Sequence, residues 1–129
     1  SRGGELTCVL GCGGDRDALK RPLMAAAAEA AADHVVLTSD NPRSESPEAI
    51  VAAMVKGLKR PQSARIELDR ALAIAQAVAQ AQAQDVVLVA GKGHESEQEI
   101  MGVRHPFSDV AQARMALQQR AAQPQGAAA

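Results

Sequence analysis

The sequence predicts an α/β fold in which a mostly parallel β-sheet carries helices on both faces. Apolar, β-rich runs at residues 6–10, 35–38 and 85–90 alternate with segments that favour helices of roughly 10–15 residues. A loop rich in glycine or charged residues follows each of these runs. Because crossovers between parallel strands are right-handed, we expect the three loops to lie at one edge of the sheet.

Composition predicts one domain with an aliphatic core. The chain has 129 residues, about one domain by length, and contains one Phe but no Trp or Tyr. We expect the domain to span residues 1–120. Residues 121–129, rich in Gln, Pro, Gly and Ala, are expected to form a flexible tail or linker.

Charge and cysteine content argue against several classes of protein. The formal net charge is −1, from 14 basic and 15 acidic residues, so no nucleic-acid or membrane partner is predicted. No apolar run is long enough to span a membrane, and no signal peptide is visible. Cys8 and Cys12 do not make a metal site by themselves, and reduced thiols in a cytoplasmic protein are expected.

The first half of the chain should contain two strands, each followed by a helix. After the strand at residues 6–10 comes a loop at 11–21. Pro22 suits the first position of a helix over residues 23–32. The strand at 35–38 leads into a turn, after which Ser46 is expected to cap a helix that ends near Gly57. Apolar residues recur on one face of that helix at Ile50, Val51, Met54, Val55 and Leu58.

The second half continues the alternation. Residues 65–68 predict a short strand, and Asp69 is expected to cap a helix over 70–82 that buries Leu72, Ala75 and Val78 or Ala79. Residues 85–90 give the clearest strand, and residues 99–103 predict a hairpin or an edge strand. Ser108 should cap a last helix that ends near Arg120.

Two glycine-rich segments suggest cofactor motifs that they do not complete. Residues 11–14 begin like the dinucleotide fingerprint G-x-G-x-x-G, but Arg16 stands where the third glycine is required. Residues 91–93 resemble part of a P-loop, but Val86 stands where its first glycine is required and no Ser or Thr follows Lys92. Ser44 has no visible base, which disfavours a hydrolase triad. An oxidoreductase is thus disfavoured, and the chain contains no complete triphosphate cradle.

The charged residues of the three loops suit the ends of an amino acid. Arg16 and Arg43 are fork-shaped donors for carboxylate or phosphate, and Asp40 and Glu95 are acceptors for ammonium groups. Together they would fit a small molecule with an amino acid at each end. The alternatives are local: residues 40–43 could form an ordinary Asx-type turn, and Arg16 could pair with a neighbouring aspartate.

Three further side chains leave two interpretations open. Lys20 and Arg21 could approach a nucleotide phosphate or could lie on the solvated surface. His94 could face a ligand or be structural.

The turn at residues 40–43 should be stiff, because Pro42 fixes its own φ and biases Asn41 towards extended geometry.

Taken in order, these motifs resemble one known family. Gly-Cys-Gly-Gly-Asp-Arg-Asp at 11–17, Lys-Arg-Pro-Leu-Met at 20–24, Asp-Asn-Pro-Arg at 40–43 and Ala-Gly-Lys-Gly-His-Glu at 90–95 are similar to the C-terminal domain of the Mur ligases. The segment at 105–109 is similar as well. The resemblance covers roughly residues 5–120, and its four motifs together are highly specific.

The resemblance implies a Rossmann-like domain of a bacterial, cytoplasmic ligase that builds peptidoglycan. Such ligases use ATP to convert the D-Glu carboxylate of UDP-MurNAc-L-Ala-D-Glu to an acyl phosphate, which the amine of the incoming amino acid attacks. An arginine at the end of the Asp-Asn-Pro-Arg turn is associated with meso-diaminopimelate. The implied amino-acid-binding positions are Arg16, Asp40, Asn41, Pro42, Arg43, Gly91 and Glu95.

The resemblance also implies that much of the enzyme lies outside this chain. In the family, the P-loop, the Mg²⁺ ligands and the UDP-sugar site belong to upstream domains. This chain is therefore expected to supply the diaminopimelate subsite, to help close over ATP and to be inactive alone, without catalytic or metal-binding residues of its own. The competing hypothesis is an independent amino-acid- or nucleotide-binding module on the same fold.

Overall fold

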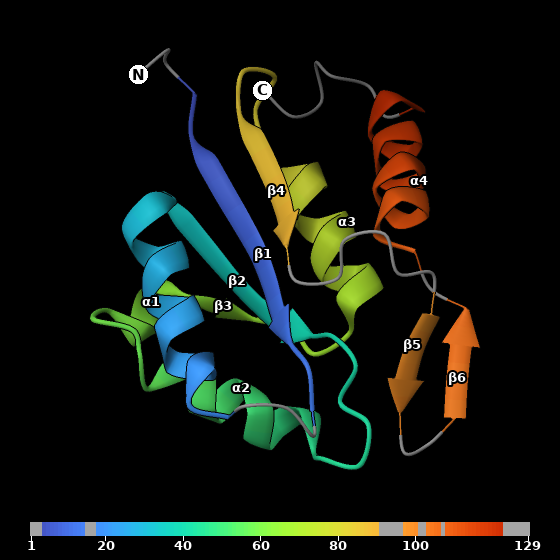
Figure 1. The fold of residues 1–129 in the computed structure, drawn as a ribbon. Helices are drawn as coiled ribbons and strands as arrows, with labels where there is room; N and C mark the ends of the chain where they lie inside the picture. The colour runs from blue at the N-terminus through green and yellow to red at the C-terminus, as the bar shows by residue number, and fades with distance from the viewer. Residues whose placement is uncertain (1–3, 15–17, 91–96, 101–102, 107, 123–129) are drawn as a thin grey trace.

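The structure is a computed structural model that describes residues 4–14, 18–90, 97–100, 103–106 and 108–122. Its main sheet is parallel throughout, with the strand order β3-β2-β1-β4 (Figure 1). The strands are β1 (Leu6–Cys12), β2 (His34–Ser39), β3 (Arg65–Ile66) and β4 (Val86–Ala90). The predicted α/β class with a parallel sheet is confirmed.

Four α-helices cover both faces of this sheet, as predicted. They are α1 (Lys20–Ala31), α2 (Pro47–Val55), α3 (Arg70–Gln80) and α4 (Asp109–Ala122), with the short 3₁₀ helix η1 (Pro61–Ser63) before β3. A separate antiparallel hairpin joins β5 (Glu97–Ile100) to β6 (Val103–Pro106), in agreement with the hairpin predicted near residues 99–103. Figure 1 shows α3 beside α4, and α1 and α2 away from them.

The core has two layers, one on each side of the sheet. Alternate residues of a strand point to opposite faces. Leu10 and Leu37 therefore pack against α1 and α2, while Val9 and Val36 pack against α3 and α4. Met54 and Ile74, from α2 and α3, are both fully buried, at 0% exposure. The aliphatic core expected from the composition is thus divided between the two faces.

The buried face of α3 differs in part from the predicted one: Val78 is buried and Ala75 is partly buried, as expected, but Leu72 is not. Leu72 is 43% exposed, and the buried positions are Arg70, Ala73, Ile74, Ala77 and Val78. These positions follow the i, i+3, i+4, i+7, i+8 spacing of one helix face. The small side chains of Ala73 and Ala77 let the helix approach the sheet closely. Hydrophobicity of the side chains alone does not predict that these alanines are the buried positions.

The first strand is longer than predicted, because it includes Gly11 and Cys12. Gly11 pairs with Thr38 of β2, and Cys12 pairs with Ser39. Glycine at position 11 reflects a close approach: an added Cβ would lie 2.7 Å from Arg70 Nη1 and 2.8 Å from the Ser39 carbonyl. The sequence pattern instead predicted that this glycine begins the loop after the strand.

Several element boundaries also differ from the prediction. The first helix begins at Lys20, so Pro22 is its third residue and not its first. The helix α2 ends at Val55, before Gly57, although Leu58 beyond it is still buried. The third strand is only two residues long, and α4 continues to Ala122. The domain boundary at residue 120 stays a prediction.

The three predicted N-caps are present. The Ser46 and Ser108 hydroxyls and the Asp69 carboxylate each accept a backbone N–H three residues further on, from Ala49, Ala111 and Leu72. The side-chain oxygen thereby satisfies one of the amide donors that a helix leaves unpaired at its start. Local sequence therefore set the starts of α2, α3 and α4.

The strand order places a topological switch point at the carboxyl ends of β1 and β4. From β1 the chain crosses to β2 and then β3, and it returns to the other side of β1 to form β4. In open α/β sheets, ligands bind outside the carboxyl ends of the strands where the winding reverses. A ligand site is therefore expected beside the segments that follow β1 and β4. Of these, the structure describes the start of the segment after β1, which contacts the segment after β2.

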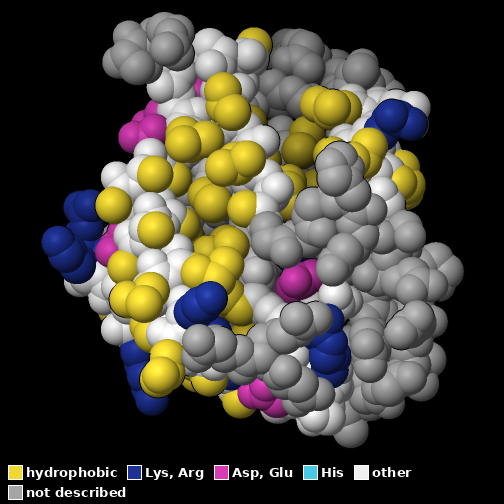
Figure 2. Space-filling model, viewed as in Figure 1, with side chains coloured by type: hydrophobic (Ala, Val, Ile, Leu, Met, Phe, Trp, Pro, Cys, Tyr) yellow, Lys and Arg dark blue, Asp and Glu magenta, His cyan; other side chains and the backbone are white. Residues whose placement is uncertain are grey.

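One face of the molecule exposes many apolar side chains (Figure 2). On β4, Val86 and Leu88 are 59% and 50% exposed, and on α1 Leu23 is 68% exposed. The outward positions of β4 pair with Leu6 and Cys8 of β1, so they lie on the same side of the sheet as α1. None of the helices in the described part of the chain is long and apolar enough to cross a membrane.

Candidate functional site

The segments that follow β1 and β2 join at the carboxyl edge of the sheet. The Gly14 N–H donates a hydrogen bond of 2.6 Å to the Asn41 carbonyl oxygen. Gly14 is buried, and a Cβ added there would collide with the Pro42 carbonyl. A glycine at position 14 is therefore required for the two segments to approach this closely.

Arg43 ends the Asp-Asn-Pro-Arg turn in an uncommon backbone conformation. Its φ is +54°, and no other non-glycine residue in the described part of the chain has a positive φ. The left-handed region costs a residue with a Cβ roughly 1–2 kcal/mol, whereas glycine adopts it readily. Such strain is concentrated at functional sites, where the surrounding structure maintains it.

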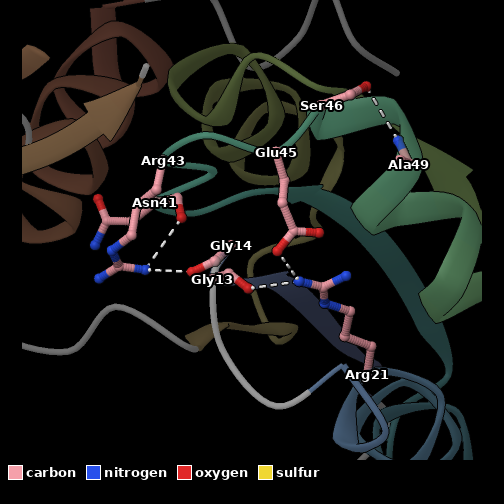
Figure 3. A network of polar contacts seen from close by, with 8 residues as sticks. All are labelled: Gly13, Gly14, Arg21, Asn41, Arg43, Glu45, Ser46 and Ala49. Carbon is pink, nitrogen blue, oxygen red and sulfur yellow. Dashed lines mark hydrogen bonds and ion pairs between the residues drawn. The ribbon is translucent and has the colours of Figure 1, made fainter. Parts of the chain in front are cut away.

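The segments after β1 and β2 meet at Gly14 and Asn41, and we call this place the junction. The guanidinium of Arg43 is anchored to backbone of both segments. Its Nη1 donates to the Gly14 carbonyl at 2.9 Å and to the Asn41 carbonyl at 3.3 Å (Figure 3). The side chain is half-buried. Because a guanidinium remains charged at every physiological pH, the anchored group places a fixed positive charge at the carboxyl edge of β2.

The other turn residues lie deeper. Asp40 is 6% exposed and Asn41 is 7% exposed, and Pro42 is fully buried. Just before them, the Ser39 hydroxyl donates to the Leu68 carbonyl at 2.7 Å. The turn is therefore buried, and the residue before it is bonded to the segment between β3 and α3; in this respect it differs from an ordinary solvated Asx turn.

Arg21 belongs to a second polar network beside the turn. One of its nitrogens, Nη2, donates to Glu45 Oε2 at 2.7 Å and to the Gly13 carbonyl at 3.2 Å (Figure 3). Arg21 is only 5% exposed, so the alternative of a solvated surface position is wrong for this residue. The pair ties α1 to both segments of the junction. A phosphate contact by Arg21 stays a prediction.

The remaining predicted site residues divide into two groups. Lys20 is exposed at the start of α1, beside Arg21, which is compatible with either of its two interpretations. The others lie outside the described residues: Arg16, Gly91, His94 and Glu95. The structure thus brings together Asp40, Asn41, Pro42 and Arg43 with the Gly13–Gly14 segment.

Cys12 is the buried thiol nearest to the site. Burial raises the pKa of this thiol; Arg21 lowers it and Asp40 raises it further. Its Sγ lies 3.8 Å from the Met24 sulfur. A thiol with a raised pKa stays protonated at neutral pH, so Cys12 is a packing residue and not a nucleophile.

Sequence reasoning missed three residues that hold this edge: Glu45, Arg70 and Asp109. Arg70 and Asp109 form a buried ion pair with an Nη2–Oδ2 distance of 2.7 Å. One signal could have identified Arg70, because an arginine at the first position of a helix opposes the helix dipole and suggests another role. Glu45 gave no comparable signal, since its partner is 24 residues away.

Other features of the structure do not compete with this edge. A hollow lined by Glu5, His34, Arg65 and Asp85, among others, lies at the amino ends of the strands, opposite to the switch point. In the described ranges, no three His, Cys, Asp or Glu side chains are grouped so that they could hold a metal ion. The described residues at the carboxyl edge offer charged side chains that are suited to bind charged groups.

Comparison with known families gives a match over most of the chain. Residues 1–93 match the family model described as "Mur ligase, glutamate ligase domain". The chain belongs to the Mur ligase family. The predicted resemblance to the C-terminal domain of a Mur ligase, based on its motifs, is thereby confirmed.

Individual Mur ligases resemble the chain closely. A UDP-N-acetylmuramoyl-L-alanyl-D-glutamate--2,6-diaminopimelate ligase of Acidovorax sp. (strain JS42) is 60% identical over 119 residues, which are 92% of this chain and 24% of that protein. The protein of the same name from Chromobacterium violaceum is 59% identical over 115 residues, which are 89% of this chain and 23% of that protein.

A solved structure extends the likeness to three dimensions. The solved structure of a UDP-N-acetylmuramoyl-L-alanyl-D-glutamate--2,6-diaminopimelate ligase superposes on this chain with a TM-score of 0.86 at 50% sequence identity. The match covers 92% of this chain and 25% of that one. The chain therefore has the fold of one part of a Mur ligase, and it spans about a quarter of the length of the relatives that it matches.

Proposed function

We propose that this chain is the amino-acid-binding domain of a ligase that adds meso-diaminopimelate to UDP-MurNAc-L-Ala-D-Glu. One observation carries the proposal: Arg43 keeps a strained backbone conformation that a glycine would adopt more easily. An arginine there is understandable if its side chain is needed. A fork-shaped cation anchored at the carboxyl edge of β2 is suited to bind the distal carboxylate of diaminopimelate.

The other predicted residues would complete the subsite. Asp40 and Glu95 would receive the ammonium groups, and Arg16 would bind a second carboxylate, with Asn41, Pro42 and Gly91 shaping the walls. Anchoring of Arg43 to Gly14 and Asn41 supports this role, because a guanidinium already held in place loses less entropy when it binds.

The chemistry would proceed in two steps within the full ligase. A D-Glu carboxylate oxygen attacks the γ-phosphorus of ATP, which gives an acyl phosphate and ADP. The neutral amine of diaminopimelate then attacks the acyl carbon. An amide bond forms, inorganic phosphate leaves and the amine loses a proton. The residues of this chain would bind and orient the amine for that attack.

Nucleotide and Mg²⁺ would be held mainly outside this chain. The sequence contains no complete P-loop, and its described side chains offer no metal cluster. Lys20, Arg21 and His94 are the residues that could meet the nucleotide when the domains close. The enzyme would be cytoplasmic and would act in peptidoglycan synthesis, as the resemblance of its motifs to the Mur ligases implies.

Replacement of Arg43 by glycine in the full-length ligase tests the proposal. The strain disappears, so the melting temperature should stay within a few degrees of the wild type. The value of kcat/KM for meso-diaminopimelate should fall about 10³-fold or more, because the distal carboxylate loses its partner. Lysine lacks that carboxylate, so the discrimination between the two amino acids should collapse.

The matched control is Arg65→Ala, which removes an exposed arginine of β3. Its kinetics should equal those of the wild type. Steady-state rates with each amino acid, together with thermal unfolding of each variant, give the readout. Unchanged kinetics with meso-diaminopimelate in Arg43→Gly would refute the assignment of the turn.

A further inference from the structure

Arg70 is a buried arginine that lies next to the candidate site. The Arg70 side chain is 0% exposed, and its guanidinium makes four hydrogen bonds. Two of them form a bidentate pair with Asp109: Nε to Oδ1 and Nη2 to Oδ2, each 2.7 Å. The other two reach the backbone: Nη1 to the Ser39 carbonyl at 3.0 Å, and Nη2 to the Ala90 carbonyl at 3.1 Å.

These two carbonyls belong to strands that are not neighbours. Ser39 is the last residue of β2, Ala90 is the last residue of β4, and β1 lies between the two strands. The guanidinium therefore bridges the sheet across the end of β1. Gly11 of β1 makes this possible, since a Cβ there would lie 2.7 Å from Arg70 Nη1.

The place of each bond in the chain is informative. Ser39 immediately precedes the Asp40–Arg43 turn, and Ala90 immediately precedes residues 91–95. Asp109 is the first residue of α4, so the same guanidinium also holds the start of that helix. A single side chain thus connects the end of β2, the end of β4 and the start of α4.

Stability alone gives a poor account of this arrangement. Arg70 is the first residue of α3, where its positive charge opposes the helix dipole. A buried ion pair contributes little net stability, because desolvation of both charges offsets their attraction, and apolar residues of similar volume often serve equally well. A rigid fork with five donors does provide fixed geometry.

We propose that Arg70 is a positioning residue that fixes the ends of β2 and β4 relative to each other and thereby places the Asp40–Arg43 turn in the diaminopimelate subsite. The inference rests on the proposed function of this subsite. It predicts that loss of the fork harms the binding of the amino acid more than the binding of ATP, which the rest of the ligase would hold.

The main test is Arg70→Met/Asp109→Asn in the full-length ligase, which removes both charges and leaves neither one buried alone. We expect KM for meso-diaminopimelate to rise at least about tenfold, because small misplacements of binding groups are costly. We expect KM for ATP to stay within about twofold of the wild type. Calorimetric titration with meso-diaminopimelate should show the same loss of affinity.

Arg70→Lys is the second variant, in case the double substitution does not fold. Lysine keeps the charge beside Asp109 but cannot hold the carboxylate and both strand carbonyls in fixed geometry. It should raise KM for meso-diaminopimelate in the same direction. Both KM values of this variant are measured below its melting temperature. A rise for meso-diaminopimelate without an equal rise for ATP supports the positioning role.

Glu29→Gln is the control for a merely structural effect. The Glu29 carboxylate accepts the backbone N–H groups of Lys59 and Arg60, in a region distant from the carboxyl edge. This variant should lower the melting temperature and leave both KM values unchanged.

The possible results separate the two proposals. An unchanged KM for meso-diaminopimelate in folded Arg70 variants, beside a wild type that uses this amino acid, overturns the positioning role alone. Equal increases in both KM values also overturn it, because they indicate general damage. A wild-type ligase that does not use meso-diaminopimelate refutes the proposed function itself.

Discussion

Two residues at the carboxyl edge occupy conformations or positions that suit other residue types better. Arg43 adopts a backbone conformation that favours glycine, and Arg70 begins a helix that favours an acid there. Both guanidinium groups bond to backbone carbonyls within the same junction. At the residue scale, the local preference for a residue type is therefore overridden where the side chain bonds to backbone at the carboxyl edge.

Gly14→Ala gives a prediction at this scale. The added methyl group would collide with the Pro42 carbonyl and force the two segments apart. The free energy of unfolding should fall by about 1–3 kcal/mol, the usual cost of overpacking. Because Arg43 is anchored to the Gly14 carbonyl, KM for meso-diaminopimelate in the full ligase should also rise.

Urea unfolding and steady-state kinetics measure the two effects. Ala52→Ser, which adds one atom at an exposed position of α2, is the control and should change the unfolding free energy by less than about 0.5 kcal/mol. A stable Gly14→Ala protein would show that the junction yields more easily than its geometry indicates.

At the element scale, the helices on the first face of the sheet are tied together by a carboxylate. Glu29, near the end of α1, accepts hydrogen bonds of 2.8 and 2.9 Å from the backbone N–H groups of Lys59 and Arg60, which follow α2. These bonds are the main reason that the pKa of Glu29 lies below its usual value. We therefore expect the contact between α1 and the segment after α2 to weaken in acid.

The sign of that sensitivity gives a second prediction. A carboxyl group with a lowered folded-state pKa stabilises the fold above its unfolded pKa, and this contribution disappears as pH falls through the lowered value. Glu29→Gln should therefore be less stable than the wild type at neutral pH, and the difference should shrink in acid. Thermal unfolding of both proteins from neutral to acidic pH measures it. A difference that grows on acidification would contradict the assigned cause.

At the scale of the whole molecule, the chain is one part of a larger arrangement. It spans 24% of its Acidovorax relative, and its sequence contains no complete P-loop. In the proposed function, the residues at its carboxyl edge bind and orient the amino acid. Activity would then arise where this edge meets the nucleotide-holding part of the ligase.

We predict that the chain alone is inactive. With ATP, Mg²⁺, meso-diaminopimelate and UDP-MurNAc-L-Ala-D-Glu, it should release no ADP above the background rate, whereas the full ligase should. Calorimetry should detect at most weak binding of the amino acid. Tight binding of meso-diaminopimelate, lysine or ATP by the chain alone would favour an independent binding module instead.

Much of the fold follows from local sequence signals. Runs of β-branched and apolar residues specified the strands, and Ser46, Asp69 and Ser108 marked the starts of three helices. The predicted boundaries of the helices and strands were less accurate, because each boundary depends on the residues that pack or pair with it in the fold. Gly11 belongs to β1 only because β2 and the Arg70 guanidinium approach it closely, and Leu72 lies outside the core because alanines pack nearer the sheet.

By itself, the sequence determined the parallel α/β class, the motifs that mark the Mur ligase family and the turn that carries Arg43. These properties depend on residue type and short spacing along the chain. Only the tertiary structure revealed the strain at Arg43, the burial of Arg21 with Glu45 and the Arg70 bridge between β2 and β4. Each of these arises from groups brought together by strand order, and no local pattern in the chain encodes that proximity.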